Sequence, residues 1–211
     1  MIRIITIERE YGCGAAEIAR KVADRLGWKL WDQHLTAEIA SLANCRHSDI
    51  EQREEKRDPL YYTLLKSFWR GSYEGSVNVS VDPLKLLDAD SIVHIAQRVI
   101  GQAVGEGNCV IVGRGSQHFL KDREDTLRFF LYAPQEDKVQ RLVAQGNEES
   151  EAWSLVERVD RERAAFIRKY FHADWPNREV YHAMLNTAAG DDAVVRAILS
   201  FTEARPEKKA A

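Results

Sequence analysis

The sequence predicts a single-domain α/β protein in which a central, mostly parallel sheet of about five strands lies between two layers of helices. Short apolar segments alternate with amphipathic segments along most of the 211 residues, and this alternation is typical of parallel strands joined by crossover helices. The first apolar segment runs into a glycine-rich turn and then into a helical pattern. The chain length suits one such domain with room for a small insertion.

The first elements follow from local patterns. Residues 2–7 are mostly β-branched and predict a buried strand. Residues 16–26 place apolar side chains at helical spacing, and Gly27 stands where a helix C-cap is expected. A short strand over 28–31 and a helix over 35–44 follow. Residues 46–90 combine charged, aromatic and glycine-rich stretches, which we interpret as an insertion of helix and loop and not as a separate domain.

The second half of the chain continues the alternation. Its patterns predict a helix over 91–104, strands over 109–112 and 127–132, two charged helices over 135–145 and 148–170, a strand over 180–187 and a helix over 191–201. We expect one domain over residues 1–202 and a disordered polar tail over 203–211. Ligands of open parallel sheets bind at the carboxyl ends of the strands. Polar side chains that follow the strands are therefore the first candidates for a site.

The composition limits the classes of partner. The net charge of −3 argues against a protein that binds nucleic acid polymers, because such domains carry a basic excess. Cys13, Cys45 and Cys109 are odd in number and far apart, which predicts neither a disulfide framework nor a zinc site. No apolar segment has the pattern of a signal peptide or the length of a membrane span. We expect a cytoplasmic protein that does not bind membranes, and a homodimer stays open.

The glycine-rich turn after the first strand reads E-R-E-Y-G-C-G-A-A-E. Gly12 and Gly14 allow backbone N–H groups to surround an anion at a helix start, so the turn is a candidate phosphate loop. Ala15 and Ala16 stand where a full P-loop carries its lysine and its hydroxyl. Arg9 is a candidate substitute for the lysine, because a guanidinium binds phosphate through two hydrogen bonds. The alternatives are a close turn without a ligand and an exposed Arg9 paired with a neighbouring glutamate.

Five segments, in order, resemble the cytidylate kinase-like P-loop proteins. They are T-I-E-R-E-Y-G-C-G-A-A-E-I-A-R-K-V-A-D-R-L-G with the W-D that follows, V-I-V-G-R-G, L-Y-A-P, V-D-R-E-R and L-N-T. The resemblance spans nearly the whole chain and implies a P-loop NTPase-type three-layer α/β/α fold with a helical lid. It also implies ATP and Mg²⁺ as cofactors, small-molecule nucleotides as partners, and transfer of the γ-phosphoryl group to a nucleoside monophosphate, with CMP or dCMP as the acceptor.

The resemblance also implies roles for individual residues. The nucleotide would bind at the loop residues Gly12, Cys13, Gly14, Ala15, Ala16 and Glu17. Asp160 and Arg163 occupy the D-x-x-R positions, where the family's aspartate binds the acceptor ribose and its arginine a phosphate. Arg161 would act with Arg9 and Arg163 as a catalytic cation, and Arg168 would bind substrate from a lid over 146–175. The alternative is a solvated helix stabilised by charge pairs one turn apart.

Two further substrate-binding candidates follow predicted strands. Arg114 lies in G-R-G after strand 109–112, whereas cytidylate kinases read G-R-D, with the arginine near the acceptor phosphate and the aspartate near the base. Gly115 replaces that aspartate and leaves the acceptor's identity open. Asp32 resembles the family's aspartate after the second strand, and an N-cap is its alternative role. No set of metal-ligating side chains is predicted.

Three functions remain open on this basis. The leading one is an active nucleoside monophosphate kinase, with the insertion 46–90 as a candidate acceptor-binding segment. The second is a nucleotide-binding regulator that has lost catalysis, because the lysine and the magnesium-binding hydroxyl are absent. The third is a P-loop kinase for a different small-molecule acceptor, since one fold supports many acceptors.

Overall fold

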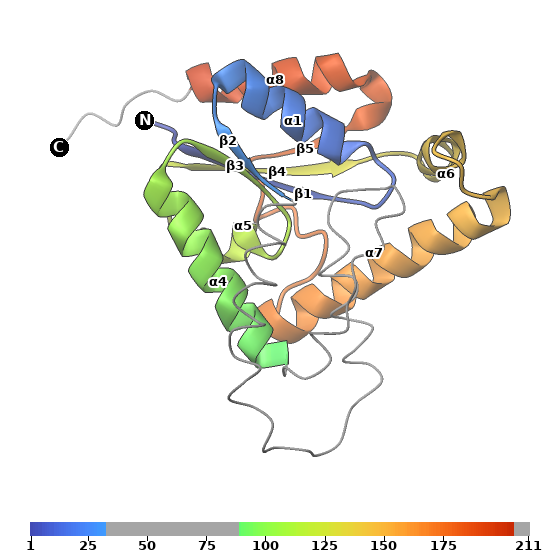
Figure 1. Cartoon of the computed structure of the whole chain (residues 1–211), viewed down its shortest axis with the longest axis horizontal. Helices are drawn as coiled ribbons and strands as arrows, with labels where there is room; N and C mark the ends of the chain where they lie inside the picture. Colours follow the sequence, from blue (N-terminus) through green and yellow to red (C-terminus); the bar gives the residue numbers. More distant parts are fainter. Residues whose placement is uncertain (33–88, 205–211) are drawn as a thin grey trace.

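The computed structural model describes residues 1–32 and 89–204 (Figure 1). Its sheet has the strand order β2-β3-β1-β4-β5, and every pair of neighbouring strands is parallel. The five strands found in these residues are β1 (Ile4–Arg9), β2 (Lys29–Trp31), β3 (Cys109–Val112), β4 (Thr126–Tyr132) and β5 (Ala183–Asn186). This arrangement confirms the predicted α/β fold and places β1, which leads into the glycine turn, at the centre of the sheet.

Helices cover both faces of the sheet. Figure 1 shows α1 and α8 on one face and α4 and α7 on the other, with α6 beyond the carboxyl end of β4. The helices are α1 (Ala15–Leu26), α4 (Ala89–Glu106), α5 (Ser116–Phe119), α6 (Gln135–Ala144), α7 (Glu149–Phe171) and α8 (Asp191–Ala204), and a 3₁₀ turn spans Thr187–Ala189. Within the described ranges, no helix is both long and apolar enough to span a membrane.

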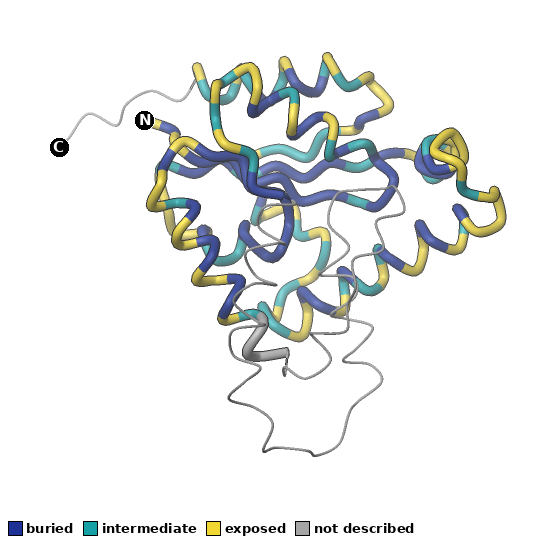
Figure 2. The backbone as a smooth tube through the Cα atoms, in the orientation of Figure 1, coloured by how far each residue is buried: buried dark blue, intermediate teal, exposed yellow. Residues whose placement is uncertain are grey.

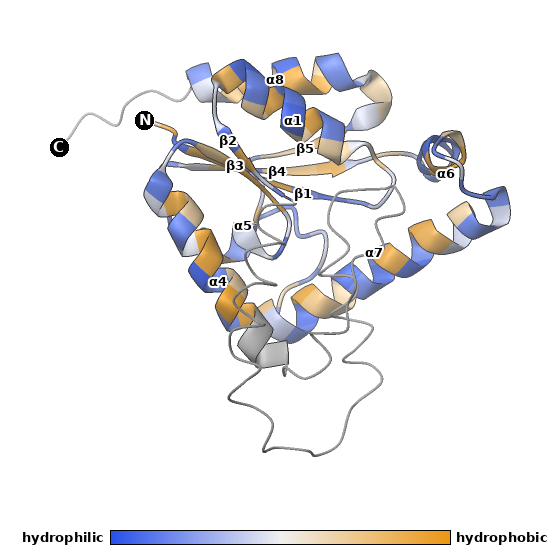
Figure 3. Ribbon diagram, viewed as in Figure 1, coloured by the Kyte–Doolittle hydropathy of each residue, from blue (hydrophilic) through white to orange (hydrophobic). Residues whose placement is uncertain are grey.

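The core divides into two apolar layers because side chains alternate across each strand. Ile5 and Ile7 of β1 pack in the cluster that contains α1 and α8, whereas Ile4 packs with α4 and the last turns of α7. Figures 2 and 3 show the central strands β1, β3 and β4 as almost continuously buried and mostly apolar. Glu8 follows Ile4 in the alternation and is buried as well. The acidic end of β1 therefore belongs to the face that α7 covers.

Most predicted elements agree with the structure within a few residues. Strand 109–112 is reproduced without change, and Gly27 caps α1 in a left-handed conformation. The last strand is shorter than predicted, the last helix runs to Ala204 and so takes in the first two residues of the predicted tail, and the four-residue α5 was not predicted. The predicted helix over 35–44, nearly all of the insertion 46–90, Cys45 and residues 205–211 lie outside the described residues.

Replacing Phe129 with alanine tests the layer between β4 and α8. Phe129 is fully buried, and its ring meets that of Phe201 edge to face at 5.4 Å between centroids. Truncation leaves a cavity, so we expect the free energy of unfolding to fall by about 3–5 kcal/mol. Val143→Ala, at an exposed site of α6, should change it by less than about 0.5 kcal/mol. Urea unfolding measures both variants, and equal stabilities would contradict this packing.

Candidate functional site

The glycine turn lies between β1 and α1, and α6 packs against it. A Cβ atom added to Gly12 would come within 3.0 Å of the Lys138 Cβ atom, and one added to Gly14 would overlap the Arg141 guanidinium. Both positions favour glycine because their φ values are 82° and 78°. At Gly12 the Cβ and backbone atoms of Lys138 also leave no room for a side chain. The turn brings the amino terminus of α1 together with two cationic side chains, which is the chemistry of an anion site.

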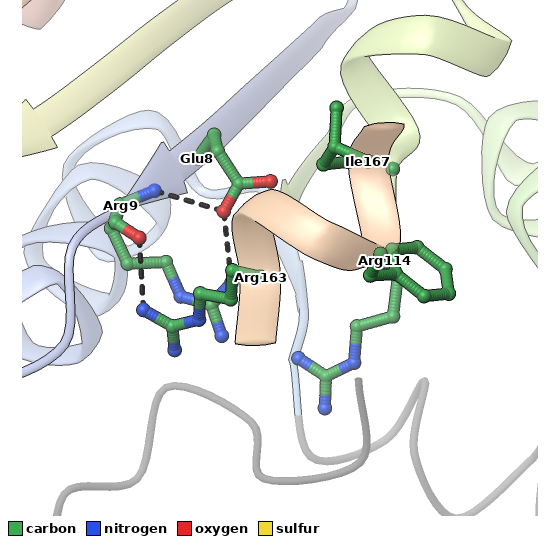
Figure 4. A pocket seen from close by; sticks show the side chains of 7 residues that line it. Glu8, Arg9, Arg114, Arg163 and Ile167 are labelled. Atoms are coloured by element: carbon green, nitrogen blue, oxygen red, sulfur yellow. Dashed lines mark hydrogen bonds and ion pairs between the residues drawn. The ribbon is translucent and has the colours of Figure 1, made fainter. Parts of the chain in front are cut away.

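A pocket lies on the α7 side of the carboxyl ends of β1 and β3. Its lining combines three arginines, one carboxylate, one glycine and two apolar side chains: Arg9, Arg114, Arg163, Glu8, Gly115, Phe166 and Ile167 (Figure 4). The exposed fractions of the three arginine side chains are only 5%, 1% and 7% in that order. Three of the predicted site residues thus meet in one buried place, although they come from three separate segments of the chain.

Each of these arginines lies beside a carboxylate. Nη1 of Arg9 lies 3.1 Å from Glu8 Oε1, and Nη1 of Arg114 lies 3.4 Å from Asp32 Oδ1. Burial lowers the pKa of Arg114 to about 10, and Asp32 opposes that shift. The guanidinium therefore stays charged at neutral pH. Asp32, predicted to bind substrate, is the carboxylate that lies beside Arg114, and its role toward substrate stays a prediction.

Arg163 and Asp160 lie one turn apart on α7 and contact the strand end and the turn. Nη1 of Arg163 donates to the carbonyl oxygen of Arg9 at 2.9 Å, as Figure 4 shows. Asp160 accepts a hydrogen bond from the Tyr11 N–H at 2.7 Å and lies 3.3 Å from Lys138 Nζ. Burial raises the pKa of Asp160, and the neighbouring Arg163 and Lys138 oppose this shift. Asp160 and Arg163 therefore both contact the candidate phosphate loop.

The other predicted site residues are not in this pocket. Arg161 and Arg168 have 76% and 75% exposed side chains, and each lies within 4 Å of an exposed carboxylate. Glu17 pairs with Arg20 on the outside of α1, and this hydrogen bond lowers the pKa of Glu17. Cys13 is buried, and its Sγ donates to a carbonyl of β4. These four residues do not line the pocket, and their predicted roles stay predictions.

Sequence reasoning missed Lys138 and Arg141. They lie three residues apart on α6, which follows the carboxyl end of β4, and they therefore share one helix face. That spacing after a strand was an available signal. Its meaning depended on β4 being the sheet neighbour of β1, which local patterns do not show.

The structure gives a reason why glycine, and not aspartate, stands at the third position of G-R-G. Gly115 has a φ of 71°, and a Cβ atom there would overlap the ring of Phe171. Phe171 in turn stacks on His118 with 4.5 Å between ring centroids. A Cβ atom on Gly113 would overlap the guanidinium of Arg9. Both glycines thus leave room for side chains of other elements.

The sequence matches the profile of the cytidylate kinase-like family over residues 4–189. The chain belongs to this family. This cytidylate kinase-like chain has no match among curated proteins. Among solved structures, an uncharacterized protein from Eubacterium ventriosum is similar at 20% identity and a TM-score of 0.68, with 96% of this chain and 98% of that chain covered.

A shikimate kinase from Acinetobacter baumannii, solved in complex with shikimate, is similar at 15% identity and a TM-score of 0.50, with 99% and 97% covered. A shikimate kinase from Bacteroides thetaiotaomicron has the same TM-score at 12% identity, with 95% and 98% covered. At these identities the similarity shows the fold alone, which is that of the P-loop kinases.

The cytidylate kinase-like family implies ATP and Mg²⁺, and the residues of this chain fit the nucleotide better than the metal. For the nucleotide, the loop offers glycines, a helix start and the Arg141 guanidinium beside Gly14. The buried Nε of Arg9 has no hydrogen-bond acceptor among the described residues, which suits a nearby anion. For the metal, Ala16 offers no hydroxyl, and no group of three metal-ligating side chains is found in residues 1–32 and 89–204.

Gly115→Ala should destabilise this family member more than Gly27→Ala does. Both glycines have left-handed backbones, with φ of 71° and 65°, but only at Gly115 does the added methyl group meet a neighbour, the ring of Phe171. We expect both variants to lose about 1 kcal/mol from backbone strain, and Gly115→Ala to lose about 1–3 kcal/mol more from overpacking. Urea unfolding measures the difference.

The double variant Gly115→Ala with Phe171→Ala is the control for that overlap. Removing the ring makes room for the methyl group, so the cost of Gly115→Ala should fall to that of Gly27→Ala in the Phe171→Ala background. An unchanged cost in that background would contradict the overlap.

Proposed function

We propose that this protein is a P-loop kinase that transfers the γ-phosphoryl group of ATP to a small acceptor whose anionic group binds among Arg9, Arg114 and Arg163. A nucleoside monophosphate, CMP or dCMP, is the first candidate acceptor. The observation that carries this proposal is the meeting of three buried arginines in one pocket beside a glycine loop, at the carboxyl edge of a parallel sheet.

The charge of the pocket supports an anionic acceptor. Three guanidiniums line the pocket with one carboxylate, Glu8. The other two acids beside these arginines, Asp32 and Asp160, are not part of the lining, so the surface that an acceptor would meet is mostly cationic. Asp32 and Asp160 approach Arg114 and Arg163 at 3.4 and 3.5 Å, which is long for a charge-assisted hydrogen bond. A phosphate would offer these guanidiniums shorter contacts.

The nucleotide is expected at the glycine loop, where Arg141 supplies the positive charge that the absent lysine would have given. When bound, ATP supplies the phosphoryl group, and the protein's part is to position the two substrates and neutralise charge. Arg141 is partly held by Asp191, whose Oδ1 lies 3.4 Å away. The loop backbone and Arg141 would bind phosphate oxygens, while the arginine pocket would orient the acceptor.

Two observations favour the two alternative functions, a kinase for a different acceptor and a nucleotide-binding regulator. Phe171 fills the space beside Gly115, so this position offers no counterpart to the base-reading carboxylate of cytidylate kinases, and this favours a kinase for another small acceptor. Ala15 and Ala16 replace the catalytic lysine and hydroxyl, and this favours a nucleotide-binding regulator. Turnover and acceptor choice distinguish the three functions.

A phosphoryl-transfer assay with Arg114→Ala tests the proposal. Wild type with Mg-ATP should produce ADP in the presence of an acceptor from a panel of CMP, dCMP, UMP, AMP and small hydroxylated carboxylates. Losing a buried charge contact to the acceptor should lower kcat/KM about 100-fold or more, while ATP binding persists. The control is Arg123→Ala, at the amino end of β4 and 43% exposed, which should stay within about twofold of wild type.

Binding of ATP without turnover on any acceptor would overturn the kinase proposal and favour the regulator. Turnover with a hydroxylated carboxylate and none with nucleotides would keep the kinase and replace CMP as its acceptor.

Arg161→Ala and Arg168→Ala test the predicted lid. Both side chains are largely exposed, so each change should leave the free energy of unfolding within about 0.5 kcal/mol of wild type. If the two arginines neutralise the transferring group in a closed form, kcat should fall about 100-fold with an unchanged Kd for ATP. Lys169→Ala, an exposed neighbour on α7, is the control. An unaffected kcat would assign both arginines to a solvated helix face.

A further inference from the structure

We infer that Asp160 is a positioning residue for the phosphate loop, which it holds together with Lys138 and Arg163 in the form that binds the nucleotide. The inference rests on the proposed function for the nucleotide, while its geometry rests on contacts between described residues. It assigns Asp160 a role different from the acceptor-ribose contact that the resemblance implies.

The backbone on either side of Glu10 is bonded to α7. The carbonyl oxygen of Arg9 accepts from Arg163 Nη1 at 2.9 Å, and the N–H of Tyr11 donates to Asp160 Oδ1 at 2.7 Å. The bonded residues are about 150 positions apart in the sequence, so these bonds fix the loop to a helix that is distant along the chain. The aromatic ring of Tyr11 is buried as well. The strand end is thus held from one side just before the first glycine.

Lys138 of α6 holds the loop from the other side. Its Nζ lies 2.8 Å from Glu10 Oε2 and 3.3 Å from Asp160 Oδ2, and its side chain is only 8% exposed. The backbone of Lys138 also lies against Gly12. One buried cation therefore joins two carboxylates, one from the loop and one from α7. Removing either carboxylate would leave the buried lysine with a single partner, which is unfavourable.

These contacts bear on binding because a glycine-containing loop has many conformations when it is not held. A protein whose competent form is only partly populated binds its ligand more weakly by that fraction. Holding residues 9–11 in advance lowers this cost. Both oxygens of Asp160 are engaged by the loop and by Lys138 in this form, and so they act on the nucleotide site through the backbone.

Hydrogen exchange in the free protein tests the contact without any ligand. Followed by NMR, the amide proton of Tyr11 should exchange about tenfold or more faster in Asp160→Ala than in wild type, because its charged acceptor is lost. Asp160→Asn keeps an oxygen acceptor but loses the charge facing Lys138, so its rate should lie between the two. Glu157→Gln removes an exposed carboxylate of the same helix and should exchange Tyr11 as wild type does.

Calorimetric titration with Mg-ATP, in the absence of any acceptor, tests the consequence. The Kd for ATP should rise about tenfold or more in Asp160→Ala, less in Asp160→Asn, and not at all in Glu157→Gln. If Asp160→Ala does not fold, Asp160→Asn still decides the matter through both measurements.

Two results would overturn the inference. One is an unchanged Tyr11 exchange rate in the folded Asp160 variants. The other is an unchanged Kd for ATP in the folded Asp160 variants, which would show that Asp160 does not act on the nucleotide site. If wild type binds no Mg-ATP, the proposed function and the nucleotide half of the inference both fail, whereas faster Tyr11 exchange would still establish the contact with the loop.

Discussion

The burial of three arginine side chains at the ends of β1 and β3 is the constraint on which the rest of the site depends. A guanidinium cannot leave water without compensating charge, and Glu8, Asp32 and Asp160 are found beside the three at 3.1, 3.4 and 3.5 Å. These acids come from β1, from the end of β2 and from α7. Satisfying the arginines therefore fixes how the sheet, the loop and the long helix fit together.

The four glycines of this site make room for groups of neighbouring elements. At each of Gly12, Gly14, Gly113 and Gly115, the volume that a side chain would take is occupied by part of another element. At Gly14 and Gly113 the neighbouring group is a guanidinium, of Arg141 and Arg9, which lies directly against the backbone. A glycine-rich turn is usually taken as a sign that a ligand binds its backbone. In this protein the glycines also mark where groups of other elements lie against the backbone.

Local patterns were sufficient for the fold and for part of the site. The buried strand 109–112 was unambiguous because four apolar residues precede a glycine turn, and Arg9 and Arg114 followed from their positions after strands. Lys138 and Arg141 were missed because their importance comes from the sheet order, in which β4 lies beside β1. The role of Gly115 depends on Phe171, which lies 56 residues later in the sequence. Contacts between such distant segments cannot be predicted from local sequence patterns.

Helix α7 has 23 residues and is therefore about 34 Å long. Its middle contacts the phosphate loop through Asp160, and its later turns line the arginine pocket through Phe166 and Ile167. One helix thus contacts both the proposed nucleotide loop and the proposed acceptor pocket. If its position differs between the empty and the filled states of either region, the two affinities become thermodynamically linked, and each ligand must change the binding of the other by the same factor. The helix would then couple the two binding equilibria, whichever ligand enters first.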